Sequence, residues 1–193
     1  MVQTTVDALT INHLVAMDSL QSMAKGYLLN CRCENKSPKT IEIYGMVLDN
    51  LIWFFEHKNL PTQVQNITTT NIREFLWYLA SEEHRWGSSN PSAWRKASPT
   101  TVHIYYRSMK TFFNWLKRED LISNNPYSLI KPPKQEKKVI QALATIEIQR
   151  LFEACEGKTM YDVRNKAILS VLLDSGLRIS ELTNLKYEDF DQT

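Results

Sequence analysis

Helical periodicity is the feature of this chain that most constrains its fold. Apolar residues recur at three- and four-residue intervals through most of the 193 residues, and the alternating pattern typical of strands is nearly absent before the C-terminus. In an α-helix this spacing places apolar side chains on one face, which has to be buried against another element. The sequence therefore predicts a mainly α protein.

Two helix starts share one pattern, Ser-Pro-x-Thr, at Ser37–Thr40 and Ser98–Thr101. The serine can cap the free backbone amides of the first turn, and proline suits the first helical position. The first of these helices is expected to end near His57. Two more helices are predicted, one from about Met17 to Cys31 and one capped within Thr68–Thr70.

Four helices joined in this way predict one compact domain over roughly residues 12–120. Its buried faces are expected to include several large side chains, Tyr27, Leu48, Phe55, Phe75 and Phe112. Asn125-Pro126 is expected to end the domain. The Pro- and Lys-rich stretch 131–138 cannot be helical through its two prolines and is interpreted as an extended linker.

A second unit is predicted from about Val139. Thr145 is expected to cap a first helix, and an apolar helix is expected from Asp162 to about Ser175, with Gly176 as its C-cap. The inward residues of this helix would be Ala167, Ile168, Val171 and Leu172. A short helix is expected to open at Leu177–Leu182, and a strand to begin at Tyr187–Asp191.

The net charge of +2 conceals a strong asymmetry along the chain. Residues 84–138 hold 11 Lys and Arg against 3 Asp and Glu, a net of +8, whereas the residues before and after this band are each net −3. A local basic band indicates contact with a polyanion. The alternative is a solvated, charge-rich linker, and charge alone does not separate the two interpretations.

The composition gives few signs of a membrane, a redox motif or a metal. No apolar run reaches the length of a membrane span, and Met1–Thr10 lacks the pattern of a signal peptide. Cys31, Cys33 and Cys155 lack the spacing of zinc or redox motifs. Reduced thiols, a cytoplasmic location and no bound metal are expected.

Arg178 is the most informative candidate for chemistry. It follows the glycine cap, lies between Leu177 and Ile179, and has Glu181 three residues further on. A guanidinium held by that carboxylate can grip a phosphate through two hydrogen bonds and stabilise charge that develops on its oxygens. From spacing alone, an ordinary Arg–Glu helix pair remains the alternative.

Several segments together carry a resemblance to a known family. Gly176–Leu182, preceded by Leu172-Leu173 and followed by Leu185-Lys186 and Asp189, resembles the first catalytic-arginine motif of the tyrosine recombinases, the phage-integrase family. Ser37–Thr40 with Tyr44 and Leu48, Phe112–Leu116, Asn125-Pro126 and Pro132–Lys134 resemble the family's core-binding domain in the family's order. Ser175, where the family often has threonine, is a conservative departure.

The resemblance implies a four-helix SAM-like core-binding domain at 15–122, after an N-terminal tail at 1–14. A basic linker at 123–138 and the helical start of a catalytic domain at 139–193 follow. In the family a tyrosine attacks the scissile phosphate with no metal, cofactor or nucleotide. Arg178 matches the first catalytic arginine and Glu181 its supporting acid. The chain ends before counterparts of the lysine, the His-x-x-Arg motif and the nucleophilic tyrosine, so a truncated, catalytically incomplete domain is expected.

The resemblance also implies double-stranded DNA as the partner, with possible homo-oligomers on DNA. It places the second and fourth helices at the major groove, with candidate contacts Lys39, Thr40, Ile43, Thr100, Thr101, His103, Arg107 and Lys110. Helical spacing independently puts Thr100, His103, Arg107 and Lys110 on one face. The linker lysines Lys131, Lys134, Lys137 and Lys138 suit phosphate contact, or are merely solvated.

Two further points stay open at the level of sequence. The long loop His84–Ala97 either tracks a sugar-phosphate backbone with its basic and aromatic residues or packs on its own tryptophans. The chain as a whole could be a DNA-binding piece of a recombinase, a non-catalytic regulator that occupies recombination sites, a helical interaction module without DNA, or a decayed remnant.

Overall fold

The computed structural model describes residues 18–83, 85–87, 89–134 and 141–189, and the side chains of Arg85 and Ala93 are not described. The chain divides into two compact units, 1–137 and 138–193, each described by itself. The mainly α prediction is confirmed. Over the described ranges the structure contains no strand, only an isolated antiparallel bridge between Ser19 and Gln63.

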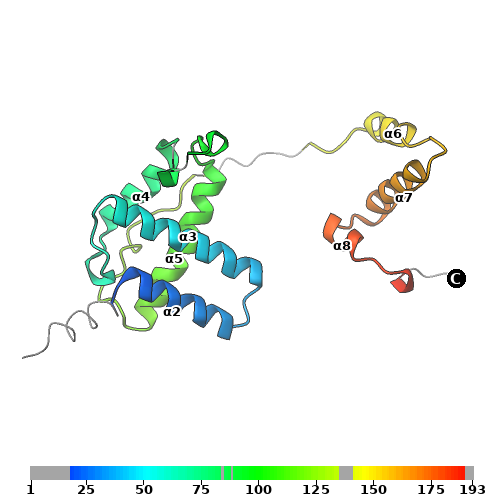
Figure 1. Ribbon diagram of the computed structural model, residues 1–193. Coiled ribbons are helices and arrows are strands. Elements are labelled where there is room, and N and C mark those ends of the chain that lie inside the picture. The colour runs from blue at the N-terminus through cyan, green and yellow to red at the C-terminus, as the bar shows by residue number, and fades with distance from the viewer. Residues whose placement is uncertain (1–17, 84, 88, 135–140, 190–193) are drawn as a thin grey trace, which may run out of the picture. The chain divides into compact units, whose positions relative to one another are not determined.

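The described part of the first unit is built on four α-helices, with α5 in contact with each of the other three (Figure 1). These helices are α2 Leu20–Cys33, α3 Pro38–His57, α4 Thr69–Ser81 and α5 Pro99–Arg118, with short 3-10 turns η1 Val64–Asn66, η2 Arg85–Gly87 and η3 Pro91–Ala93 between them. The expected start of the first helix at Met17 lies outside the described residues. The helix begins at Leu20, because the Ser19 hydroxyl caps it by accepting the Ser22 amide at 3.1 Å.

The predicted helix starts are confirmed by their hydrogen bonds. The Ser37 hydroxyl accepts the Thr40 amide at 3.2 Å, and the Ser98 hydroxyl accepts the Thr101 amide at 3.1 Å. Thr68 and Asn71 form a reciprocal capping box at the start of α4. Each bond satisfies a backbone donor that would otherwise be unpaired at a helix N-terminus.

The five large side chains expected in the core are buried. Phe112 lies at the crowded centre, with its ring 5.4 Å from that of Tyr27 and 5.2 Å from that of Phe113. On the other side, Phe75 lies 5.1 Å from Phe54, ring centre to ring centre. Aromatic rings at these separations form one continuous core across the four helices.

The long loop His84–Ala97, for which the sequence allowed two interpretations, packs against the core through Trp86. The ring of Trp86 stacks on Tyr105 at 6.3 Å and meets Trp53 edge to face at 5.6 Å, while its backbone N–H donates to the Tyr78 hydroxyl at 3.2 Å. These contacts hold Trp86 at φ 65, a conformation that L residues rarely adopt. Trp94 is 45% exposed, and His84 lies outside the described residues.

The chain that follows α5 stays attached to the helices as far as Ile130. The Tyr106 hydroxyl donates to the Ile130 carbonyl at 2.9 Å, and the Thr69 hydroxyl donates to the Pro126 carbonyl at 2.9 Å. Tyr127 is 2% exposed. Residues 126–130, which sequence reasoning placed in the linker, therefore pack as part of the first unit.

Tyr127 makes the first unit sensitive to alkali. Burial raises the pKa of Tyr127 well above its ordinary value of 10.0, and its hydroxyl has no hydrogen-bond partner among the described residues. Above pH ~10 the tyrosine ionises in the unfolded chain and stays neutral in the folded one, so stability is present below that pH and falls above it, by up to about 1.4 kcal/mol per pH unit.

Tyr127→Phe is expected to leave neutral stability nearly unchanged and to reduce the alkaline loss, because it removes an ionisable, unsatisfied hydroxyl. Urea midpoints of both proteins at about pH 8 and about pH 11 would measure this difference. Tyr161→Phe serves as the control, since Tyr161 is 68% exposed. An equal alkaline loss in wild type and Tyr127→Phe would contradict the assignment.

The second unit contains α6 Thr145–Glu153, α7 Met160–Ser175, α8 Ile179–Thr183 and a 3-10 turn, η4 Tyr187–Asp189. Gly176 ends α7 at φ 65, as expected.

Two expectations for the second unit are wrong. The expected cap of α6 was Thr145, but Ala144 is the cap residue, and the Glu147 carboxylate accepts the Ala144 amide at 2.7 Å. The strand at Tyr187–Asp191 is also wrong over its described part, because the Asp189 carboxylate accepts the Lys186 amide at 2.8 Å and closes a turn. Asp191 lies outside the described residues.

The helices of the second unit bury none of their described side chains completely. Of the four residues expected inside α7, Ile168, Val171 and Leu172 are half-buried, whereas Ala167 is exposed. Leu173 and Ile179 are 57% and 64% exposed. The periodicity identified the helix correctly, but within this unit its apolar face is only partly covered.

Candidate nucleic-acid interface and the Arg178 site

A groove between α3 and α5 collects three of the predicted contact residues, Thr40, Ile43 and Arg107. It encloses about 200 Å³, and its remaining lining residues are Tyr44, Ile104, Ser108 and Thr111. The two helices cross in the first unit, which brings residues more than sixty positions apart in sequence to one surface (Figure 1). We call this the α3–α5 groove.

Arg107 is the exposed cation of the groove. Its guanidinium makes no hydrogen bond or ion pair within the part of the chain that the structure describes, although its backbone carbonyl accepts the Thr111 hydroxyl at 2.9 Å. Helix α5 carries four cations, Arg107, Lys110, Lys117 and Arg118, and no Asp or Glu. A basic helix face with an unpaired guanidinium is suited to an anionic partner.

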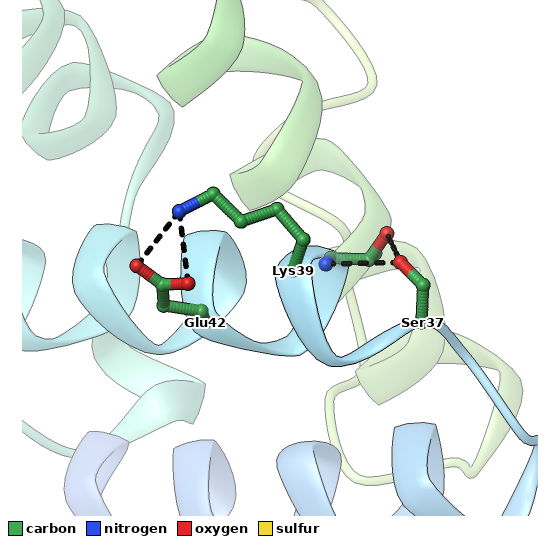
Figure 2. Close-up of polar contacts among 4 residues, drawn as sticks. Ser37, Lys39 and Glu42 are labelled. Carbon is green, nitrogen blue, oxygen red and sulfur yellow. Dashed lines mark hydrogen bonds and ion pairs between the residues drawn. The ribbon is translucent and has the colours of Figure 1, made fainter. Parts of the chain in front are cut away.

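Lys39 and the capping threonines are engaged locally. The Lys39 ammonium donates to both oxygens of the Glu42 carboxylate, each at 2.9 Å, on the exposed first turn of α3 (Figure 2). The hydroxyls of Thr40 and Thr101 share hydrogen bonds with the capping serines at 2.8 and 2.9 Å. Both threonines thus serve helix initiation in the free protein, whereas Thr100 is exposed at the start of α5.

His103 and Lys110 flank the Tyr106 ring, outside the lining of the α3–α5 groove. The His103 ring lies 6.2 Å from that of Tyr106, and the Lys110 ammonium lies 5.9 Å from the same ring centre. This contact favours one position of the lysine side chain on α5. Lys131 and Lys134 are exposed, and Lys137 and Lys138 lie outside the described residues.

Sequence reasoning missed Tyr44, Ile104 and Thr111 as groove residues. Ile104 gave a usable signal, because it is an isoleucine outside the apolar stripe of its helix, and it is 42% exposed. A second missed feature is an ion-pair cluster in which Glu34 lies 2.8 Å from Lys36 and 3.6 Å from Arg118. The hydrogen bond from Lys36 lowers the pKa of Glu34.

Arg178 is the cap residue of α8 and is paired with Glu181 in two ways. One carboxylate oxygen accepts the Arg178 backbone amide at 2.7 Å, and the other accepts the guanidinium at 3.0 Å. The arginine side chain is 82% exposed. Its apolar neighbours do not enclose it, since Ile179 is itself 64% exposed. The pairing orients the guanidinium and leaves it accessible.

Two other kinds of feature, a metal site and a membrane-spanning helix, are absent from the part of the chain that the structure describes. No group of three or more His, Cys, Asp or Glu residues there could hold a metal ion. None of the described helices is both long and apolar enough to span a membrane.

Two family models match this sequence. The model described as the N-terminal SAM-like domain of phage integrase matches residues 24–123, and that of the phage integrase family matches residues 141–193.

Curated relatives of this chain are tyrosine recombinases. Tyrosine recombinase XerC of Bacillus pumilus is 38% identical over 82% of this chain and 47% of its own length. XerC of Anoxybacillus flavithermus is 30% identical over 82% of this chain and 48% of its own.

The chain therefore spans about half the length of the curated relatives that it matches.

Solved structures of integrases have the same fold as this chain. A λ integrase tetramer bound to a Holliday junction gives a TM-score of 0.67 at 16% identity, covering 100% of this chain and 51% of that one. The integrase of transposon Tn1549 in complex with a circular intermediate DNA gives 0.61 at 18% identity, covering 90% and 49%.

Proposed function

The chain belongs to the phage integrase family of tyrosine recombinases, and from this premise we propose that it binds double-stranded DNA in site-specific recombination. The observation that carries the proposal is the α3–α5 groove, with an unpaired Arg107 on a helix that has four cations and no carboxylate. We assign DNA binding to residues 15–122. We assign residues 123–138, of which 126–130 pack on the first unit, as the connection to the unit that begins at 139.

We divide the proposed contacts into two kinds. The phosphate-neutralising cations would be Arg107, Lys110, Lys131 and Lys134, whereas the uncharged groove residues around Arg107 would face base edges. Lys39 would exchange its Glu42 partner for a phosphate on binding. Thr100 and His103, three positions apart on α5, lie on one helix face, and together with Thr101 they would fix the register of α5 on the duplex.

Arg178 and Glu181 form the proposed phosphate clamp of the second unit. The carboxylate fixes the guanidinium, which is exposed and free to present its remaining N–H groups to a DNA phosphate. Glu181 would act as a positioning residue. We further propose a cytoplasmic location and assembly of several copies on DNA, since relatives of the same fold are described as DNA-bound dimers and tetramers.

The proposal predicts strongly salt-dependent duplex binding. Each phosphate that is neutralised releases counterions, so log K should fall with log salt with a slope of about −0.9 per phosphate contact. Fluorescence anisotropy of a labelled random-sequence duplex, titrated with the 193-residue chain at several KCl concentrations, would measure this slope. Affinity that does not change with salt, or no binding at low salt, would overturn the proposal.

A nicked suicide duplex separates binding from chemistry. These 193 residues contain no match to the family's nucleophilic tyrosine, so we expect the chain to bind such a duplex without forming a covalent adduct on a denaturing gel. A covalent adduct would show that one of the eight tyrosines acts as a nucleophile.

A further inference from the structure

We propose that the α3–α5 groove is a receptor for the C5-methyl group of thymine, with Ile43 and Ile104 as its apolar walls. The inference rests on the proposed DNA binding and deepens it, because it states what the chain reads in a duplex. It assigns Ile104 as a specificity-determining residue.

The walls of the groove are aliphatic where the surface around them is polar. Ile104 is 42% exposed and is the one large apolar side chain of α5 that is exposed, on a helix whose other exposed residues are mainly polar or basic. Ile43 faces it from α3 and is half-buried. The exposed part of the Ile104 side chain contributes nothing to folding, and its burial against a ligand would be favourable.

The hydroxyl groups of the lining threonines are already engaged. Thr40 shares its hydroxyl with Ser37 at 2.8 Å, and Thr111 donates to the Arg107 carbonyl at 2.9 Å. The Thr111 hydroxyl is therefore not a free donor toward a ligand. The groove therefore offers apolar surface beside the Arg107 guanidinium, with Tyr44 and Ser108 also in its lining. A ligand that has a methyl group next to a hydrogen-bond acceptor or an anion fits this lining.

Thymine in a duplex fits that description. Its methyl group projects into the major groove, where cytosine has none, and apolar side chains recognise it by contact. An arginine beside the methyl-binding walls can donate to the O6 and N7 acceptors of a neighbouring guanine or to a phosphate oxygen. The absence of Asp and Glu from α5 favours a nucleic acid over a basic peptide as the occupant.

The test removes the methyl group and nothing else. The full chain first selects preferred duplexes from a random-sequence pool. The best duplex is then remade with deoxyuridine in place of each thymidine in turn, which keeps every hydrogen-bonding group. We expect one or two positions at which uracil weakens binding about fourfold, the effect of one buried methyl group. Uracil at the other positions should have no effect.

Two variants link that loss to the groove. Ile104→Ala should bind the thymine and uracil duplexes equally well, whereas Leu29→Ala should keep the fourfold preference, because Leu29 is 59% exposed on α2 and is not among the groove's lining residues. Ile104→Val provides a milder change should the alanine variant fold poorly, and circular dichroism would establish folding.

The outcomes distinguish the inference from the function on which it rests. If uracil changes nothing while salt-dependent binding persists, the methyl receptor is wrong and DNA binding stands. If Ile104→Ala retains the uracil effect, the methyl group contacts another surface and the inference again fails. If the chain binds no duplex at any salt concentration, the proposed function fails together with it.

Discussion

Replacing Arg107 with glutamate is expected to weaken duplex binding at least about tenfold and to reduce the salt slope by about 1. The guanidinium is exposed in the α3–α5 groove and has no hydrogen-bond or ion-pair partner in the described part of the chain, so the substitution removes no polar interaction of that side chain. It places a carboxylate where the helix has only cations. Anisotropy titrations over a range of KCl concentrations would give both quantities.

Arg73→Glu is the matched control for this experiment. Arg73 is an exposed arginine on α4, away from the groove, and its reversal changes the net charge by the same amount. We expect it to lower affinity only slightly, through the overall field. Equal losses in the two variants would mean that net charge, rather than the α3–α5 groove, governs binding, and unchanged affinity in Arg107→Glu would remove the groove from the interface.

The four helices of the first unit could be predicted because their signals are local. Ser37 and Ser98 cap their helices as the Ser-Pro-x-Thr pattern indicated, and three- and four-residue spacing identified buried residues such as Phe75 and Phe112. Capping depends on contacts within one turn, and the apolar face depends on a repeat within one helix. Both are visible in sequence.

Features that depend on contacts between distant segments could not be predicted in this way. The attachment of residues 126–130 to α4 and α5 depends on bonds such as that from Thr69 to Pro126, 57 positions apart. The α3–α5 groove depends on how two helices cross, so the participation of Tyr44 and Thr111 was missed. In the second unit, the Glu147 carboxylate accepts a backbone amide at Ala144, so the cap is not Thr145. The Asp189 carboxylate accepts the Lys186 amide, so a turn forms where a strand was expected.

Phe112→Ala is expected to destabilise the first unit by about 3–5 kcal/mol, the typical cost of deleting a buried phenyl ring. Phe112 is fully buried, and its ring centre lies 5.4 Å from that of Tyr27 and 6.3 Å from that of Trp115. Since domains have only about 5–15 kcal/mol of stability in total, the variant should lose a large part of its resistance to urea.

Tryptophan fluorescence isolates the unit being tested, because all five tryptophans of the chain lie between Trp53 and Trp115. Phe152 lies on the half-buried face of α6, in the second unit, so Phe152→Ala should leave the urea unfolding transition seen by tryptophan fluorescence unchanged. Phe112→Leu should shift that transition less than Phe112→Ala does, because leucine fills most of the cavity. A Phe112→Ala midpoint equal to that of wild type would mean that the four helices are not held together by the aromatic cluster. The rigidity of the α3–α5 groove would then have to come from other contacts between its two helices.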